Sequence, residues 1–161
     1  MQVSPSLLMT IALLTLTGTA MADVHANPHG GVQVDVPHDW KTHVDGDVLV
    51  ATDPHEEAAV IFVVSNSDDM KKVGDAVDAE LGKVAKNVKW GAQHKVTMGG
   101  MSGISMDGSA SIDGHAVSTG AIIVVTPKKK GVFLIGFAQK DKEAKHSDEL
   151  AKIAGSLALT H

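Results

Sequence analysis

The chain has 161 residues, a formal net charge of −5 and no cysteine. All 14 basic residues are lysine, so the chain has no planar guanidinium group to bind phosphate in a bidentate way. Together with the negative net charge, this argues against a nucleic-acid-binding protein. Without cysteine the chain has no disulfide, no lipid-bearing thiol and no thiol nucleophile. The length suits one domain.

The N-terminal segment has the pattern of a secretory signal peptide. Residues 7–16, LLMTIALLTL, form an apolar run that is too short for a transmembrane helix, which needs about 20 residues. The sequence AMA at residues 20–22 then supplies a small-x-small cleavage pattern, with VHA at residues 24–26 as a second possible site. We therefore predict a signal peptide over residues 1–22 and a periplasmic protein without a stable membrane anchor.

Residues 23–31 are polar and contain Pro28 and two glycines, so we expect a flexible N-terminal tail. A single α+β domain should then occupy residues 32–161. Valine alternates with polar residues over 32–36, which predicts a strand with one buried face. Two further strands are expected at 47–52 and 58–65.

The hydrophobic period changes to three or four residues after this, which predicts an amphipathic helix over residues 68–88 with Ser67 as its N-cap. The apolar stripe of this helix consists of Met70, Val73, Val77, Leu81, Val84 and Val88.

Four more strands are expected, at 90–98, 104–112, 121–127 and 131–138, with Asp113-Gly114 as a hairpin turn. The last two are apolar on both faces, so they should lie centrally in the sheet. Ser147 is the expected cap of a final helix, which carries Leu150, Ile153, Ala154 and Leu157. The predicted order is βββ-α-ββββ-α, with about seven strands in a mainly antiparallel sheet.

Two segments resemble the PsbP-like family, which comprises relatives of an extrinsic photosystem II subunit and of bacterial DcrB-type exported proteins. VQVDVPHDW (32–40) is similar to an extended segment ending in Pro-x-x-Trp, and IAGSL (153–157) is similar to the family's final helix. The resemblance extends in element order over residues 31–159. It implies an α-β-α sandwich and a non-catalytic accessory protein that binds a protein partner or a small ligand.

No spacing indicates an enzyme. GISMDG (103–108) approaches a nucleophile elbow, but it has Asp107 in place of the last glycine and lies on a predicted strand. The loop carboxylates of Glu56 and Glu57 have no base beside them in sequence. We expect no catalytic residues and no obligatory cofactor.

Histidine is the chemically richest residue type, with nine copies. His38, His43 and His55 fall in predicted turns and are expected to be exposed. Strand alternation places His94 on an apolar face with Trp90, Val96 and Met98. Imidazole and thioether together suit Cu(I), so His94 and Met98 are candidate copper ligands. The alternative is a core histidine bonded to the backbone, beside a methionine that fills space.

His25 supports an alternative function. If the chain is cut after Ala22, the new N-terminus reads Asp23-Val24-His25. Its free amine, two backbone amides and an imidazole can surround one metal ion in a plane, which suits Cu(II) or Ni(II). The alternative prediction is therefore a periplasmic copper- or nickel-binding protein that uses these three residues.

Protein purified from the periplasm should begin at Asp23 and bind one Cu(II) with the absorption band of a planar four-nitrogen site. His25→Ala should abolish the band, and so should one extra N-terminal residue, since this moves His25 from third to fourth place. His38→Ala is the control and should leave the band intact. A chain beginning at Asn27 by intact mass would refute the prediction.

Overall fold

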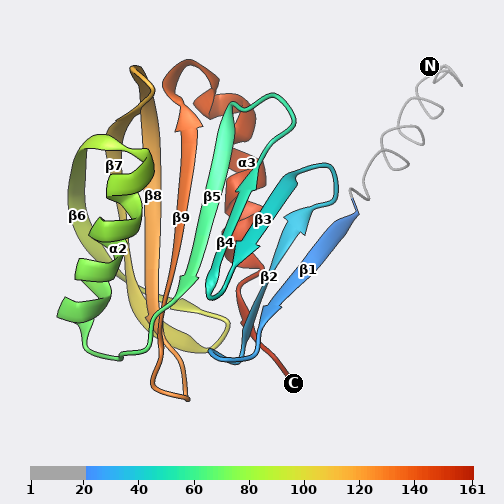
Figure 1. The fold of residues 1–161 in the computed structure, drawn as a ribbon, viewed down its shortest axis with the longest axis vertical. Helices are drawn as coiled ribbons and strands as arrows, with labels where there is room; N and C mark the ends of the chain where they lie inside the picture. The colour runs from blue at the N-terminus through green and yellow to red at the C-terminus, as the bar shows by residue number, and fades with distance from the viewer. Residues whose placement is uncertain (1–20) are drawn as a thin grey trace, which may run out of the picture.

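The computed structural model describes residues 21–161, so most of the predicted signal peptide lies outside the described residues. Seven strands form the main antiparallel sheet, and three form a smaller one (Figure 1). The main sheet has the order β3 (Lys41–Asp45), β4 (Val48–Thr52), β5 (Ala58–Val64), β9 (Gly131–Gln139), β8 (His115–Val125), β7 (Met101–Ile112) and β6 (Lys86–Met98). The smaller sheet has the order β1 (Ala22–Asn27), β2 (Val32–Pro37) and β10 (Ala158–Leu159).

Two helices cover opposite faces of the main sheet (Figure 1). Helix α2 (Met70–Val84) buries Val73, Val77 and Leu81 in one core, together with residues of β5, β8 and β9. Helix α3 (Glu143–Gly155), preceded by the 3-10 turn η1 (Lys140–Lys142), packs on the other face beside the smaller sheet. The predicted α+β class and α-β-α sandwich are confirmed.

Strand β9 lies at the centre of the main sheet, between β5 and β8. Its side chains are buried on both faces, with Leu134 in the α3-side core and Phe133 and Ile135 in the α2-side core. The doubly apolar sequence of residues 131–138 therefore predicted its central position correctly. Asp113 and Gly114 both have positive φ, as a tight hairpin turn between β7 and β8 requires.

The expected flexible tail over residues 23–31 differs from the structure, because residues 22–27 form strand β1. This strand pairs antiparallel with β2, from Ala22 opposite Pro37 to Asn27 opposite Val32. Main-chain hydrogen bonds carry this pairing, so the polar side chains do not prevent it. The turn that follows is closed by Asn27, whose side-chain oxygen accepts a hydrogen bond from the Gly30 amide at 3.0 Å.

The strand predicted at 32–36 is also present, with Val32, Val34 and Val36 fully buried. It belongs to the smaller sheet, however. The main sheet still has seven strands, because β3, which was not predicted, forms one of its edges. Alternation indicates which face of a strand is buried but not which strand it pairs with.

Both helices begin at residues other than the predicted caps. Asp69 is the N-cap of α2 and accepts a hydrogen bond from the Lys71 amide, whereas the Ser67 hydroxyl accepts one from the Asp69 amide in the preceding turn. Helix α3 starts at Glu143, so Ser147 lies inside it. Within the described residues, no helix combines the length and the apolar composition needed to cross a membrane.

Leu81 and Ile153 each have an exposed fraction of 2%, which confirms that they face the sheet. We expect Leu81→Ala and Ile153→Ala each to lower the free energy of unfolding by ~2–5 kcal/mol, because the lost methyl groups leave a cavity. Val84→Ala on α2 is the control, since Val84 is 44% exposed, and it should cost less than about 0.5 kcal/mol. Urea denaturation of the three variants measures these differences, and equal losses at Leu81 and Val84 would contradict the helix phase.

Candidate functional site

A cleft of about 310 Å³ lies between helix α3 and the main sheet. Apolar and small residues make most of its walls: Val60, Ile122, Leu134, Gly136 and Ala138 on the sheet, and Leu150, Ala151, Ile153 and Ala154 on the helix. Gly136 helps to keep the space open, because a Cβ there would meet the Leu150 side chain at 3.4 Å. The volume is at the lower end of the range for small-molecule sites.

The lining becomes polar toward β7 and the start of α3. Ser105 and Asp107 on β7, Ser118 on β8, and Glu143 and Ser147 on α3 line this part. The Ser118 hydroxyl donates a hydrogen bond to Glu143 Oε2 at 2.8 Å, which joins helix and sheet across the cleft. The cleft therefore combines an apolar floor with hydroxyl and carboxylate groups at one side, and its two carboxylates make that side acidic.

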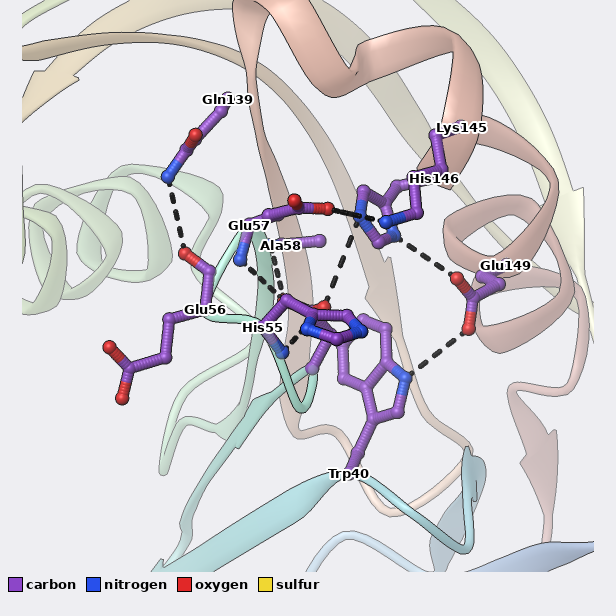
Figure 2. A network of polar contacts seen from close by, with 10 residues as sticks. Trp40, His55, Glu56, Glu57, Ala58, Gln139, Lys145, His146 and Glu149 are labelled. Atoms are coloured by element: carbon purple, nitrogen blue, oxygen red, sulfur yellow. Dashed lines mark hydrogen bonds and ion pairs between the residues drawn. The ribbon is translucent and has the colours of Figure 1, made fainter.

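The opposite flank of α3 is held by a network of polar contacts around His146, which is 2% exposed (Figure 2). His146 Nε2–H donates to Glu57 Oε2 at 2.8 Å, and Nδ1–H donates to Glu149 Oε1 at 3.1 Å. The indole of Trp40, in the turn after β2, donates to the other oxygen of Glu149 at 3.3 Å. Lys145 Nζ donates to Glu57 Oε2 at 2.9 Å. Segments far apart in the sequence thus meet at one buried imidazole.

Asp53 shapes the turn between β4 and β5 that brings Glu57 to this network. Its Oδ1 accepts hydrogen bonds from the amides of Glu57 and Ala58, at 2.6 and 2.7 Å, and its Oδ2 accepts one from the His55 amide at 3.1 Å. Asp53 Oδ2 also lies 3.9 Å from His146 Nε2. The buried carboxylate therefore fixes the turn and faces the imidazole.

The network shifts the pKa values of its members. Burial by itself lowers the pKa of His146, but the hydrogen bonds to Glu57 and Glu149 and the charge of Asp53 outweigh this effect and raise the pKa above 6.5. The hydrogen bond from His146, followed by that from Lys145, lowers the pKa of Glu57 to about 2. In its protonated form the imidazole donates from both nitrogens and holds α3 against the turn between β4 and β5.

The structure separates His94 from Trp90, with which strand alternation groups it, while His94 keeps the face of Val96 and Met98 and is exposed there. Strand β6 contains an irregularity between Trp90 and Gln93. Trp90 pairs with Gly108 and Gln93 pairs with Met106, so β6 advances by three residues where β7 advances by two. One extra residue in a strand reverses the facing of every later side chain. Trp90 consequently packs in the α2-side core, while His94 is exposed on the other face.

Met98 packs against the α3-side core, four residues beyond His94. Four residues of strand span ~13 Å, so the structure does not bring the two proposed Cu(I) ligands together. His38, His43 and His55 are exposed, as expected. His38 and His55 lie in turns, whereas His43 lies on strand β3 and not in the predicted turn.

The proposed copper or nickel site at Asp23-Val24-His25 lies within β1, opposite Val36, Asp35 and Val34 of β2. Successive amides of a strand point to opposite sides, so they cannot surround one ion while β1 remains paired. The Asp23 carboxylate also accepts a hydrogen bond from the His38 ring at 3.1 Å. Chelation by the N-terminus stays a prediction, and it now requires the start of β1 to leave the sheet.

Sequence reasoning missed His146, Asp53 and Glu149, and considered Glu57 only as a loop carboxylate. One signal was present: His146 falls in the apolar stripe of the final helix, four residues before Leu150 and seven before Ile153. Ser105, the serine of GISMDG, lies on β7, so the strand reading of this motif is confirmed.

Comparisons with known proteins agree on the fold. No family model matches the chain, and no curated protein matches its sequence. The solution structure of cyanobacterial PsbP (CyanoP) from Synechocystis sp. PCC 6803 is similar with a TM-score of 0.64 and 12% identity, over 88% of this chain and 94% of that one.

Two further structures are also similar. LpqN of Mycobacterium tuberculosis, which is involved in cell envelope biogenesis, has a TM-score of 0.55 and 20% identity, over 94% of this chain and 97% of that one. PA94 from Pseudomonas aeruginosa has a TM-score of 0.51 and 11% identity, over 84% of this chain and 94% of that one. With α2 and α3 on opposite faces of an antiparallel sheet, the chain therefore has the PsbP-like fold.

Proposed function

We propose that this protein is a non-enzymatic accessory protein of the bacterial cell envelope that holds a small ligand in the cleft between α3 and the main sheet. The cleft carries the proposal, because a concave, mostly apolar site with a few polar groups is the usual form of a small-molecule site. It favours a small ligand over a protein partner as the occupant.

The chemistry of the walls indicates the ligand class. The apolar floor around Leu134, Gly136 and Leu150 suits an aliphatic or aromatic body. At the polar side, Asp107 and Glu143 repel an anionic head and favour a neutral or cationic one that donates hydrogen bonds. The preferred ligand is therefore an apolar molecule with a hydroxyl, amide or amine group at one end.

The location is supported by two independent observations. The N-terminal sequence has the signal-peptide pattern, and LpqN, which has a similar fold, is involved in cell envelope biogenesis. Most polar groups of the network around His146 are engaged in hydrogen bonds that hold α3, which suits a binding scaffold better than a catalytic centre.

A neutral apolar dye, N-phenyl-1-naphthylamine, tests the cleft by fluorescence titration. We expect saturable binding at one site, and a loss of at least about tenfold in affinity for Gly136→Leu, because the new side chain fills the cleft below Leu150. Ala154→Leu fills the same space from the helix and should have the same effect.

Gly82→Leu is the matched control, since a side chain at Gly82 on α2 meets no other group within 4 Å. A thermal unfolding transition for each variant would verify that it is folded. Unchanged dye binding in both cleft variants would place the binding site elsewhere, and absence of binding by the wild-type protein would refute the apolar ligand class.

A further inference from the structure

The network around His146 also contains the donor set of a metal site. Asp53 Oδ2, Glu57 Oε2 and His146 Nε2 face one another, and one ligand atom from each residue lies within 4.8 Å of the other two. His146 Nε2 is 2.8 Å from Glu57 Oε2 and 3.9 Å from Asp53 Oδ2. Donors bound to one tetrahedral zinc ion lie roughly 3.3–3.6 Å apart, so only small side-chain movements separate this arrangement from a ligand set.

We propose that Asp53, Glu57 and His146 bind one divalent transition-metal ion of the Zn²⁺ class. One imidazole and two carboxylates suit such an ion, whereas Mg²⁺ and Ca²⁺ are normally held by oxygen alone. The site differs in position and in donors from the N-terminal segment at Asp23-Val24-His25. It also goes beyond the proposed ligand cleft, which lies on the other flank of α3.

The groups behind the imidazole support this assignment. A metal-bound histidine usually donates its other ring N–H to a carboxylate, a backbone carbonyl or water, which fixes the tautomer and the ring plane. Here the Nδ1–H of His146 donates to Glu149 Oε1, and Trp40 donates to the second oxygen of that carboxylate. The ring is therefore oriented with Nε2 toward Asp53 and Glu57. Glu149 and Trp40, which orient it, are not themselves in the ligand set (Figure 2).

The aspartate is equally well prepared to bind a cation. Three backbone amides of the turn between β4 and β5 hold its carboxylate, so it does not have to be ordered on binding. Its side chain is 2% exposed, whereas that of Glu57 is 16% exposed. An ion can therefore enter along Glu57, after the exposed Lys145 ammonium moves away from the Glu57 oxygen.

Charge also favours a divalent ion. Among the described residues, the carboxylates of Asp53, Glu57 and Glu149 form ion pairs only with the Lys145 ammonium and the His146 imidazolium, and Lys142 acts on Glu57 from further away. A divalent cation bound to two carboxylates and a neutral imidazole forms a neutral unit, and Lys145 then balances Glu149. Binding replaces the proton on Nε2, so each ion bound to an imidazolium releases one proton.

Calorimetric titration of EDTA-treated protein with ZnCl2 tests the site, in two buffers of different ionisation enthalpy so that proton release is measured as well. We expect one Zn²⁺ per chain with release of up to one proton. His146→Gln and Glu57→Gln should each weaken binding by more than the ten- to hundredfold expected for loss of an outer partner, and Glu149→Gln by about that amount.

His55→Gln and Glu56→Gln are the matched controls, because they change the same residue types in the same turn and lie outside the ligand set. Both should bind Zn²⁺ as the wild type does. Visible absorption of Co²⁺ in the wild-type protein gives a second measurement that needs no variant, since nitrogen and oxygen donors in a four- or five-coordinate site intensify its bands. No Zn²⁺ or Co²⁺ binding by the wild type, or undiminished binding in folded His146→Gln protein, would overturn the proposal.

Discussion

Strand β9 sets the main constraint on this molecule, because its side chains must be buried on both faces of the sheet. A sheet with an apolar strand at its centre needs a cover on each side, and α2 and α3 supply the two covers (Figure 1). The smaller sheet completes the cover on the α3 side with three fully buried valines, Val32, Val34 and Val36. The three-layer arrangement follows from this requirement.

The cover on the α3 side is incomplete, and the candidate cleft results from this. Helix α3 lies over β9 and β2, while β7 and β8 reach beyond it and carry Ser105, Asp107 and Ser118 on the same face. Small residues such as Gly136 and Ala154 leave the space between helix and sheet unfilled. The same helix is held on its other flank by His146, so its position over the cleft is fixed by a polar clamp as well as by apolar packing.

The polar clamp around His146 joins three segments that are distant in the sequence. A turn after β2, the turn between β4 and β5, and α3 all supply a donor or an acceptor within a few ångströms. Breaking one contact would leave a buried charge without its partner, which costs more than the contact itself contributes. The imidazole, the aspartate and the indole are all shielded from solvent, so this cost keeps them together and gives the proposed metal site its preorganised donors.

The sequence by itself determined the class of the fold, the positions of most strands and the central residues of both buried helix faces. At the ends of the predicted α2 stripe it was wrong, because Met70 and Val84 are exposed and Val88 belongs to β6. Leu81, Ile153 and the valines of residues 32–36 follow local periods of two or 3.6 residues, and such periods can be read from one segment at a time. The resemblance carried by VQVDVPHDW and IAGSL pointed to the same fold, which the similar structures share.

Only the tertiary structure decided where β1 pairs, which face His94 occupies and which polar residues meet. Strand β1 is held by main-chain hydrogen bonds that its polar composition does not reveal, and one extra residue in β6 reverses the facing that alternation predicted. His146 and Glu57 are separated by 89 residues, so no spacing rule connects them. Periodicity reports how each segment is buried, whereas the convergence of side chains depends on how the segments cross in space, and that is fixed only when the whole core packs.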